Sequence, residues 1–236
     1  METLNIIATP IGNRADITIR ALKALFELQV LACEDTRKSK QLMDYYKTEY
    51  KDILGEVERP RLVSYFEQNE AIRADNLIEL IKEEVKVGLV SNAGMPTISD
   101  PGYILVKKCL EQGIGVRVFP GANAAVSALA MSGYSSDKFT FLGFLPRKKG
   151  KQLKIWEDLN KSELDQTIVF YESPFRLLKT LNNIEEVFGE IEIGVARELT
   201  KVYEEMKRQK ISEWKKEYEN KKVKGELVVV FRKENK

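Results

Sequence analysis

Three loops rich in glycine and proline carry the residue types best suited to holding a ligand. They cover residues 9–13, 91–102 and 120–123, and each follows a short apolar segment. The second loop combines two Gly-Pro-rich turns with three small hydroxyls and a carboxylate. Such a loop fixes backbone N–H and C=O groups at defined angles, which suits an adenosyl and amino-acid ligand. Two simpler interpretations stay open: residues 9–13 form an ordinary tight turn, and Ser99-Asp100 caps the following helix.

The titratable residues limit the chemistry. The chain has no histidine and two cysteines, Cys33 and Cys109. An imidazole base, a Ser-His-Asp triad and a Cys-His pair are therefore excluded, and two distant cysteines cannot build a structural zinc site. We expect no metal. Proton transfer falls to a carboxylate, a lysine or a tyrosine, unless positioning alone drives the reaction.

Two common nucleotide-binding loops are absent from the sequence. No G-x-G-x-x-G follows the first apolar segment, and no G-x-x-x-x-G-K-[ST] occurs anywhere. These absences disfavour a conventional Rossmann dehydrogenase and a P-loop NTPase.

An alternation of β-rich and helical patterns positions the three loops. Strands are expected at residues 4–8, 30–33, 62–65, 88–90 and 116–119. Helices are expected from about residue 17, with Asp16 as N-cap, and at 36–46, 71–85 and 103–110. This rhythm predicts an α/β domain with a mostly parallel sheet, whose carboxyl edge holds the loops.

The pattern changes after Gly121 and predicts a second α/β domain. Residues 122–131 predict a helix of small residues, and residues 139–145 are aromatic and extended. Further strands are expected at 167–171, 191–196 and 226–231, with helices at 177–188 and 211–218. We therefore expect domains at residues 1–119 and 120–236.

Charge and hydropathy suggest a cytoplasmic protein. The net charge of +2 creates no strong overall field towards nucleic acid. Basic clusters at residues 147–154 and 207–224 are either solvated faces or contacts with an acidic partner. We expect no membrane partner, because no apolar run is long enough to span a bilayer and the N-terminus lacks a signal-peptide pattern. Two cysteines in apolar contexts fit a reducing compartment.

Eight short motifs occur in the order typical of one protein family. They are Ala8-Thr9-Pro10-Ile11-Gly12-Asn13, Asp16-Ile17-Thr18, Glu34-Asp35-Thr36-Arg37, the loop at 91–102, Pro120-Gly121-Ala122-Asn123-Ala124, Gly143-Phe144-Leu145-Pro146-Arg147-Lys148, Tyr171-Glu172-Ser173-Pro174 and Arg197-Glu198-Leu199-Thr200-Lys201. On these motifs, which extend over nearly the whole chain, the sequence resembles the ribosomal RNA small subunit methyltransferase I family of the tetrapyrrole methylase superfamily.

The resemblance implies a fold, a cofactor and a reaction. The fold has two α/β domains with the cofactor cleft between them, and the protein works as a homodimer. The cofactor is S-adenosylmethionine, and the reaction methylates the ribose 2′-oxygen of a cytidine in the decoding region of 16S ribosomal RNA, within the small ribosomal subunit. The cofactor-binding residues that we expect are Pro10, Gly12, Asn13, Ser91, Gly94, Met95, Pro96, Ser99, Gly121, Asn123, Ala124 and Tyr171.

The expected reaction also calls for a proton acceptor and for RNA contacts. Candidates for the acceptor are Glu34, Asp35, Asp100, Glu172 and Lys201, each of which could instead form a salt bridge or cap a helix. RNA contacts are expected from Arg14, Arg37, Arg147, Lys148, Arg176, Arg197 and Lys201. Tyr171 and Phe144 are candidates for stacking on a flipped base, with ordinary core packing as the alternative.

Two departures from the family pattern leave other functions open. Asn92 stands where the family usually has aspartate, and Phe66 and Gln68 stand where it usually has histidines. A methylase acting on a tetrapyrrole or on a protein residue would have the same scaffold, and so would a non-catalytic RNA-binding relative. The motifs at residues 34–37 and 171–174 favour the RNA enzymes.

Overall fold

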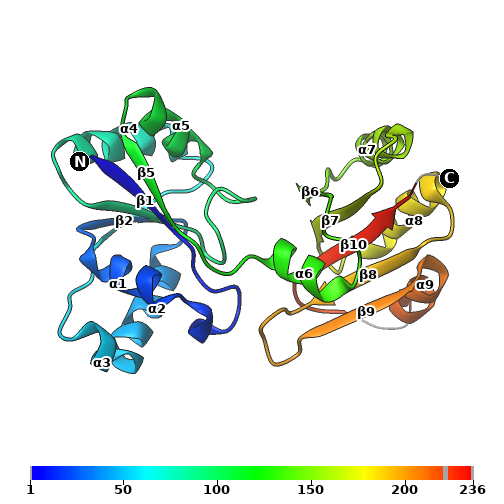
Figure 1. Ribbon diagram of the computed structural model, residues 1–236, viewed down its shortest axis with the longest axis horizontal. Coiled ribbons are helices and arrows are strands. Elements are labelled where there is room, and N and C mark those ends of the chain that lie inside the picture. The colour runs from blue at the N-terminus through cyan, green and yellow to red at the C-terminus, as the bar shows by residue number, and fades with distance from the viewer. Residues whose placement is uncertain (1, 220–222, 235–236) are drawn as a thin grey trace. The chain divides into compact units, whose positions relative to one another are not determined.

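The computed structural model describes residues 2–219 and 223–234. The chain divides into two compact units, Met1–Asn123 (unit 1) and Ala124–Lys236 (unit 2). Each unit has a five-stranded sheet covered by helices (Figure 1).

Unit 1 has a fully parallel sheet. Its strands are β1 (Thr3–Ile7), β2 (Val30–Cys33), β3 (Arg61–Ser64), β4 (Val87–Val90) and β5 (Gly115–Phe119). They lie in the order β3-β2-β4-β1-β5, and every neighbouring pair is parallel. Strands β2 and β4 are buried along their whole length, as expected for inner strands with helices on both faces. The prediction of an α/β domain with a mostly parallel sheet is confirmed.

Helices cover both faces of this sheet (Figure 1). Helices α1 (Ile19–Glu27) and α2 (Thr36–Glu49) pack on the face that carries Ile7, Leu31 and Val90. Helices α4 (Glu70–Lys82) and α5 (Tyr103–Glu111) pack on the face that carries Ile6 and Leu89. Successive strand residues point to opposite faces, so each strand contributes to both cores. A 3₁₀ turn, η1 (Arg14–Asp16), precedes α1, and a short helix, α3 (Lys51–Leu54), follows α2.

Side-chain caps fix where two helices begin. The hydroxyl of Thr18 accepts a hydrogen bond from Ala21 N at 3.2 Å, so Thr18 caps α1. The expected cap at Asp16 is wrong, because that residue ends η1. Asp35 caps α2, and its carboxylate accepts from Arg37 N at 2.9 Å.

Unit 2 has a mixed sheet. Its strands are β6 (Phe139–Phe144), β7 (Gln166–Glu172), β8 (Glu192–Arg197), β9 (Glu205–Lys210) and β10 (Leu227–Lys233), in the order β6-β7-β10-β8-β9. The β6–β7 pair is parallel, and the pairs β7–β10, β10–β8 and β8–β9 are antiparallel. The expected second α/β domain is therefore present, with a sheet type that the sequence pattern did not specify.

Four helices surround the unit 2 sheet in the described part of the chain (Figure 1). Helices α7 (Lys149–Lys161), α8 (Leu177–Phe188) and α9 (Ile211–Glu219) bury Trp156, Leu181 and Trp214 against one face. Helix α6 (Ala124–Ser132) lies over β10, β9, β8 and β7. Helix α7 and strand β9 were not predicted. The basic cluster at 207–224 forms the end of β9 and helix α9, and its residues 220–222 lie outside the described part.

Within residues 2–219 and 223–234, no helix is long and apolar enough to cross a membrane. In the same residues, no group of three or more acidic, cysteine or histidine side chains is arranged to hold a metal ion.

Candidate functional site

The three glycine-rich loops of unit 1 meet at the carboxyl edge of its sheet. Thr9 and Gly94 exchange two backbone hydrogen bonds, from Thr9 N to Gly94 O at 2.9 Å and from Gly94 N to Thr9 O at 3.0 Å. Ala8 N donates to Phe119 O at 3.1 Å, and a Cβ added to Gly121 would lie 2.8 Å from the Ala8 Cβ. The loops therefore form one packed structure, as expected where parallel strands end side by side.

The loop at 91–102 has an unusual backbone. Thr97 and Ser99 adopt φ of 73° and 63°, and Gly94 adopts 84°. Non-glycine residues in this region cost of order 1–3 kcal/mol each, and such strain is concentrated at ligand-binding sites. Neither Ser99 nor Asp100 caps α5, because the N-cap is Gly102 and its N–H donates to the Glu70 carboxylate at 3.2 Å. The simple capping interpretation is therefore wrong.

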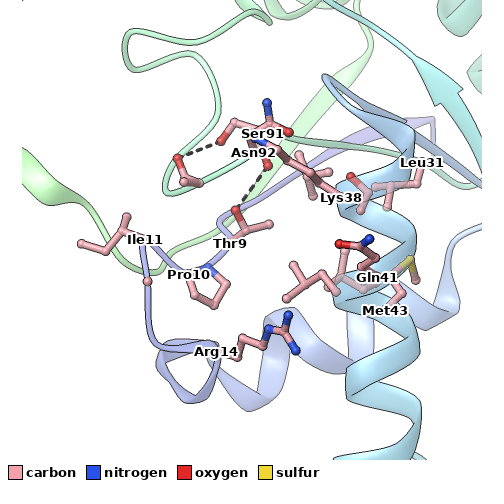
Figure 2. Close-up of a pocket in the computed structure, with 16 residues that line it drawn as sticks. Thr9, Pro10, Ile11, Arg14, Leu31, Lys38, Gln41, Met43, Ser91 and Asn92 are labelled. Atoms are coloured by element: carbon pink, nitrogen blue, oxygen red, sulfur yellow. Dashed lines mark hydrogen bonds between the residues drawn. The ribbon is translucent and has the colours of Figure 1, made fainter. Parts of the chain in front are cut away.

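A cavity of about 250 Å³ opens beside these loops (Figure 2). The first loop and η1 contribute Pro10 and Arg14, helix α2 contributes Lys38 and Gln41, and the second loop contributes Ser91, Asn92 and Ala93. The Arg14 guanidinium lies 4.6 Å above the Tyr45 ring, which holds this cation beside the cavity.

Asn92 is an unsatisfied polar residue in the cavity wall. Its Oδ1 is buried and has no hydrogen-bond partner among the described residues. A buried acceptor without a donor costs about 1–3 kcal/mol. The position thus has an acceptor that a donor from a bound molecule would satisfy.

The carboxylate of Asp100, in the second loop, interacts with the carboxylate of Glu34. The pKa of Asp100 is raised to about 6, first by burial and then by the charge of Glu34, while a hydrogen bond with Ser91 opposes the increase. Glu34 follows β2 and Ser91 follows β4, and these two strands are neighbours in the sheet. The parallel pairing therefore brings together an acidic pair whose members are far apart in sequence.

Asp35, the residue after Glu34, has an environment that lowers its pKa instead of raising it. Its hydrogen bonds with the Arg37 side chain and backbone lower its pKa to about 2. The Asp35 Oδ2 lies 3.0 Å from a guanidinium nitrogen of Arg37, and the same carboxylate caps α2. Asp35 therefore stays ionised and structurally engaged, which makes it a poor proton acceptor.

In unit 2, Glu172 is the centre of a buried polar network. Its carboxylate accepts from Thr180 Oγ1 at 2.6 Å and from Ser173 N at 2.8 Å, and it lies 3.2 Å from Arg176 Nε. Arg176 also donates to the Leu145 carbonyl at 2.7 Å. The carboxylate of Glu172 and the guanidinium of Arg176 therefore hold the loops after β6 and β7 in place.

Lys201 and Arg197 are also held by ion pairs. The Lys201 ammonium lies 3.0 Å from Glu198 and 2.8 Å from Glu226. Burial lowers the pKa of Lys201, but the hydrogen bonds to Glu226 and Glu198 outweigh it and the pKa is raised. Lys201 therefore stays protonated at neutral pH. Arg197 pairs with Glu205 at 2.5 Å.

Aromatic and basic side chains gather where β6 ends. The ring centroids of Phe144 and Tyr171 are 5.3 Å apart, and those of Phe141 and Tyr171 are 5.0 Å apart. Tyr171 is half-buried in this cluster, whereas Phe144 is exposed, as are Arg147 and Lys148.

Comparisons with known proteins decide the family. The sequence matches the tetrapyrrole (corrin/porphyrin) methylases over residues 3–215. It is 45% identical over 231 residues to the ribosomal RNA small subunit methyltransferase I of Thermotoga maritima, and the match covers 98% of each chain. The chain belongs to this family. The protein of the same name from Bacillus subtilis is 45% identical over 213 residues, which cover 90% of this chain and 69% of that protein.

Solved structures share the fold of this methyltransferase at lower identity. The structure of the methyltransferase CobJ aligns with a TM-score of 0.66 at 18% identity and covers 97% of this chain and 92% of that one. Diphthine synthase aligns with a TM-score of 0.68 at 14% identity, covering 97% and 88%. The relatives of the same name confirm the resemblance inferred from the eight motifs, and the family match and these structures confirm the tetrapyrrole methylase fold.

Only some of the expected cofactor-binding residues line the cavity of this methyltransferase. Pro10, Gly12 and Ser91 line it together with Arg14, which was expected to bind RNA. Asn13 instead accepts from Ala15 N at 3.0 Å and caps η1.

Other expected residues lie nearby in supporting positions. Gly94 pairs with Thr9, Met95 packs against the core below α4 and α5, Pro96 is buried and Ser99 is exposed. Gly121 and Asn123 lie in the loop after β5, and Ala124 begins α6.

Sequence reasoning missed the contribution of α2. Lys38, Ser39, Gln41, Leu42 and Met43 line the cavity, and none was expected to belong to a site. A signal was available: residues one turn into a helix that follows a strand of a parallel sheet lie close to that carboxyl edge. The motif at 34–37 covers only the start of α2, so the cavity-lining residues that follow it were not considered.

Proposed function

We propose that this methyltransferase transfers the methyl group of S-adenosylmethionine to the ribose 2′-oxygen of a cytidine in the decoding region of 16S ribosomal RNA. One observation carries the proposal: relatives named ribosomal RNA small subunit methyltransferase I are 39–45% identical over most of this chain. The solved cobalt precorrin-4, uroporphyrin-III and diphthine enzymes align at only 13–18% identity. The RNA substrate is therefore favoured over a tetrapyrrole or a protein residue.

The unit 1 loops fit the proposed cofactor. The Asn92 acceptor is suited to an amino group, and the strained backbone at Thr97 and Ser99 presents polar groups that an amino acid and a nucleoside can bind. Gly94 and Gly121 stand where a Cβ would crowd a neighbouring loop. When bound, S-adenosylmethionine supplies a methyl group on a positively charged sulfur. We assign its binding to Pro10, Gly12, Asn13, Ser91, Gly94, Met95, Pro96, Ser99, Gly121 and Asn123 in unit 1 and to Ala124 and Tyr171 in unit 2.

We assign the role of proton acceptor to Asp100 on the basis of its electrostatic environment. The 2′-hydroxyl loses its proton as its oxygen bonds to the methyl carbon, and a carboxylate takes that proton as the methyl–sulfur bond breaks. With a pKa raised to about 6 by burial and by Glu34, Asp100 is ionised at neutral pH and more basic than an ordinary aspartate. Of the other candidates, Glu34 contributes its charge to the environment of Asp100, Asp35 and Glu172 are held by donors, and Lys201 stays protonated.

RNA contacts are assigned to cations that are exposed. Arg14 and Arg37 in unit 1 and Arg147 and Lys148 in unit 2 are exposed. Arginine binds phosphate oxygens in a bidentate manner, and each contact would add to the salt dependence of binding. The remaining candidates, Arg176, Arg197 and Lys201, differ in being half-buried, and each is held in an intramolecular ion pair.

We also propose a homodimer that acts on the small ribosomal subunit in the cytoplasm. Large apolar side chains on α4 and α5 are exposed, namely Ile72, Tyr103 and Leu110, and such side chains are enriched in subunit interfaces. Sedimentation should give twice the mass of one chain. Ile72→Asp should shift the equilibrium towards the monomer, and an unchanged profile would argue that the interface lies elsewhere.

The decisive experiment is direct. Purified protein is incubated with methyl-labelled S-adenosylmethionine and small subunits that lack the modification, and the labelled nucleotide is mapped. Label on one cytidine ribose supports the proposal. Label on a base or on protein, or no label, refutes it.

A further inference from the structure

Two phenylalanine rings are held in solvent at one edge of the unit 2 sheet. Strands β6 and β7 are parallel, so they end at the same edge, and Phe144 pairs with Tyr171 there. Phe144 is 62% exposed, and Phe175, in the turn between β7 and α8, is 95% exposed. Burying a phenylalanine is worth about 1.5–3 kcal/mol, so two exposed rings at one edge indicate a surface that a partner covers.

The two loops that carry these rings are fixed to each other. Arg176, the residue after Phe175, donates to the carbonyl of Leu145, the residue after Phe144, at 2.7 Å. Its Nε is held by Glu172 at 3.2 Å. The turn itself is closed by hydrogen bonds from Arg176 N and Leu177 N to Ser173 O, at 3.0 and 3.1 Å. The aromatic rings are therefore presented on a rigid base, and little backbone entropy is lost when a partner binds.

Positive charge surrounds the same edge. Arg147 and Lys148 follow Phe144 closely in the chain and are exposed, and Lys151 is exposed in the first turn of α7. Exposed aromatic rings beside cations are the combination that binds single-stranded nucleic acid, because bases stack on the rings and phosphates pair with the cations. The core of a protein–protein interface is instead depleted of lysine.

We infer that Phe175 and Phe144 form a stacking platform for unpaired bases of the RNA substrate, and that Arg147 and Lys148 bind the adjoining phosphates. The inference rests on the proposed RNA substrate and adds the surface that holds the strand. Arg176 acts as a positioning residue, since it fixes the two loops and does not itself need to touch RNA.

The test measures RNA binding and methylation separately, with four single variants of the full chain. Phe175→Ala removes the ring, Phe175→Leu keeps an apolar side chain, and Phe175→Trp keeps an aromatic one. Val202→Ala is the matched control, because Val202 is 93% exposed in the loop between β8 and β9. The probes are a labelled single-stranded RNA of decoding-region sequence and a duplex of the same length.

We expect Phe175→Ala and Phe175→Leu to weaken single-strand binding at least about fivefold, as loss of one stacked base predicts. Phe175→Trp and Val202→Ala should bind like the natural protein. Both natural tryptophans are buried, so emission from an added Trp at position 175 reports locally and should be quenched by single-stranded RNA. Duplex RNA should bind equally to all variants.

Several results would overturn the inference. They are unchanged binding by Phe175→Ala, full binding by Phe175→Leu, no detectable binding of the single strand, and dissociation of a dimer by Phe175→Ala. Methylation of small subunits is followed in parallel. If the natural protein modifies no ribosomal RNA, the proposed function fails; if it does and Phe175→Ala is equally efficient at limiting substrate, only the platform fails.

Discussion

Replacing Asp100 by asparagine should make the protein more stable at alkaline pH and far less active. The folded state raises the pKa of this carboxyl from 3.8 to about 6, first through burial and then through Glu34. In the unfolded chain the carboxyl ionises at lower pH, so the folded state binds more protons between these values. Stability is therefore lost as the pH rises from about 4 to about 6, and it is not recovered above that range.

The size of the effect follows from the pKa difference. Two pKa units correspond to about 3 kcal/mol, which is an upper bound because Asp100 is only partly buried and water screens its charge. We expect Asp100→Asn to gain about 1–2 kcal/mol at pH 8 relative to the natural protein and nothing at pH 4. Asparagine can still hydrogen-bond with Ser91, so the comparison isolates the charge.

Urea unfolding at pH 4 and pH 8 measures this difference, with Asp52→Asn as a control because Asp52 is an exposed carboxylate on α3. The control should show no gain in stability at pH 8 comparable with that of Asp100→Asn. If Asp100→Asn also showed no pH-dependent gain, the reasoning about burial would be refuted. Methylation should fall by roughly 10²–10⁴-fold, the usual contribution of a general base. If Asp100→Asn were more stable at pH 8 but fully active, Asp100 would not be the proton acceptor, although the reasoning about its burial and pKa would still hold.

Three further predictions concern other parts of the chain. Glu172→Gln should lower the unfolding free energy of unit 2 by about 2–3 kcal/mol in urea titrations. The substitution leaves the guanidinium of Arg176, whose side chain is 27% exposed, without its carboxylate partner. A loss under 0.5 kcal/mol would contradict this. Gly94→Ala should abolish the rise in melting temperature that S-adenosylmethionine produces in the natural protein. The reason is that Gly94 has φ 84° and the new Cβ would lie 3.2 Å from Ile11 Cγ2. An unchanged rise would show that this glycine is not needed for cofactor binding. Arg37→Ala should weaken RNA binding and spare cofactor binding in calorimetry, and equal loss of both would count against the assignment.

Hydrophobic pattern predicted most of the buried elements, although it missed α7, which buries Trp156. Strand β2 has the bounds that its four apolar residues indicated, and α8 likewise spans 177–188 as expected. Strand β9, Glu205–Lys210, was not predictable, because its Glu-Met-Lys-Arg-Gln-Lys sequence has no apolar alternation and it is held by pairing with β8. Charged edge strands of this kind block unwanted pairing, which is why their sequences do not resemble strands.

The candidate site was predictable as a set of loops but not as a set of contacts. Glycine, proline and hydroxyl residues marked 9–13 and 91–102, and the structure joins them through Thr9 and Gly94. The pairing of Glu34 with Asp100 depends on which strands are neighbours, and a single sequence does not contain the strand order. The charge state of each candidate acid was hidden for the same reason.

The paired hydrogen bonds between Thr9 and Gly94 have a consequence for how a ligand is received. Two loops joined in this way cannot move apart without breaking both backbone hydrogen bonds. Their shape before and after binding should therefore be nearly the same, and amide exchange at Thr9 and Gly94 should be slow even without ligand. Because little binding free energy is lost to rearrangement of the loops, more of it can contribute to discrimination between ligands.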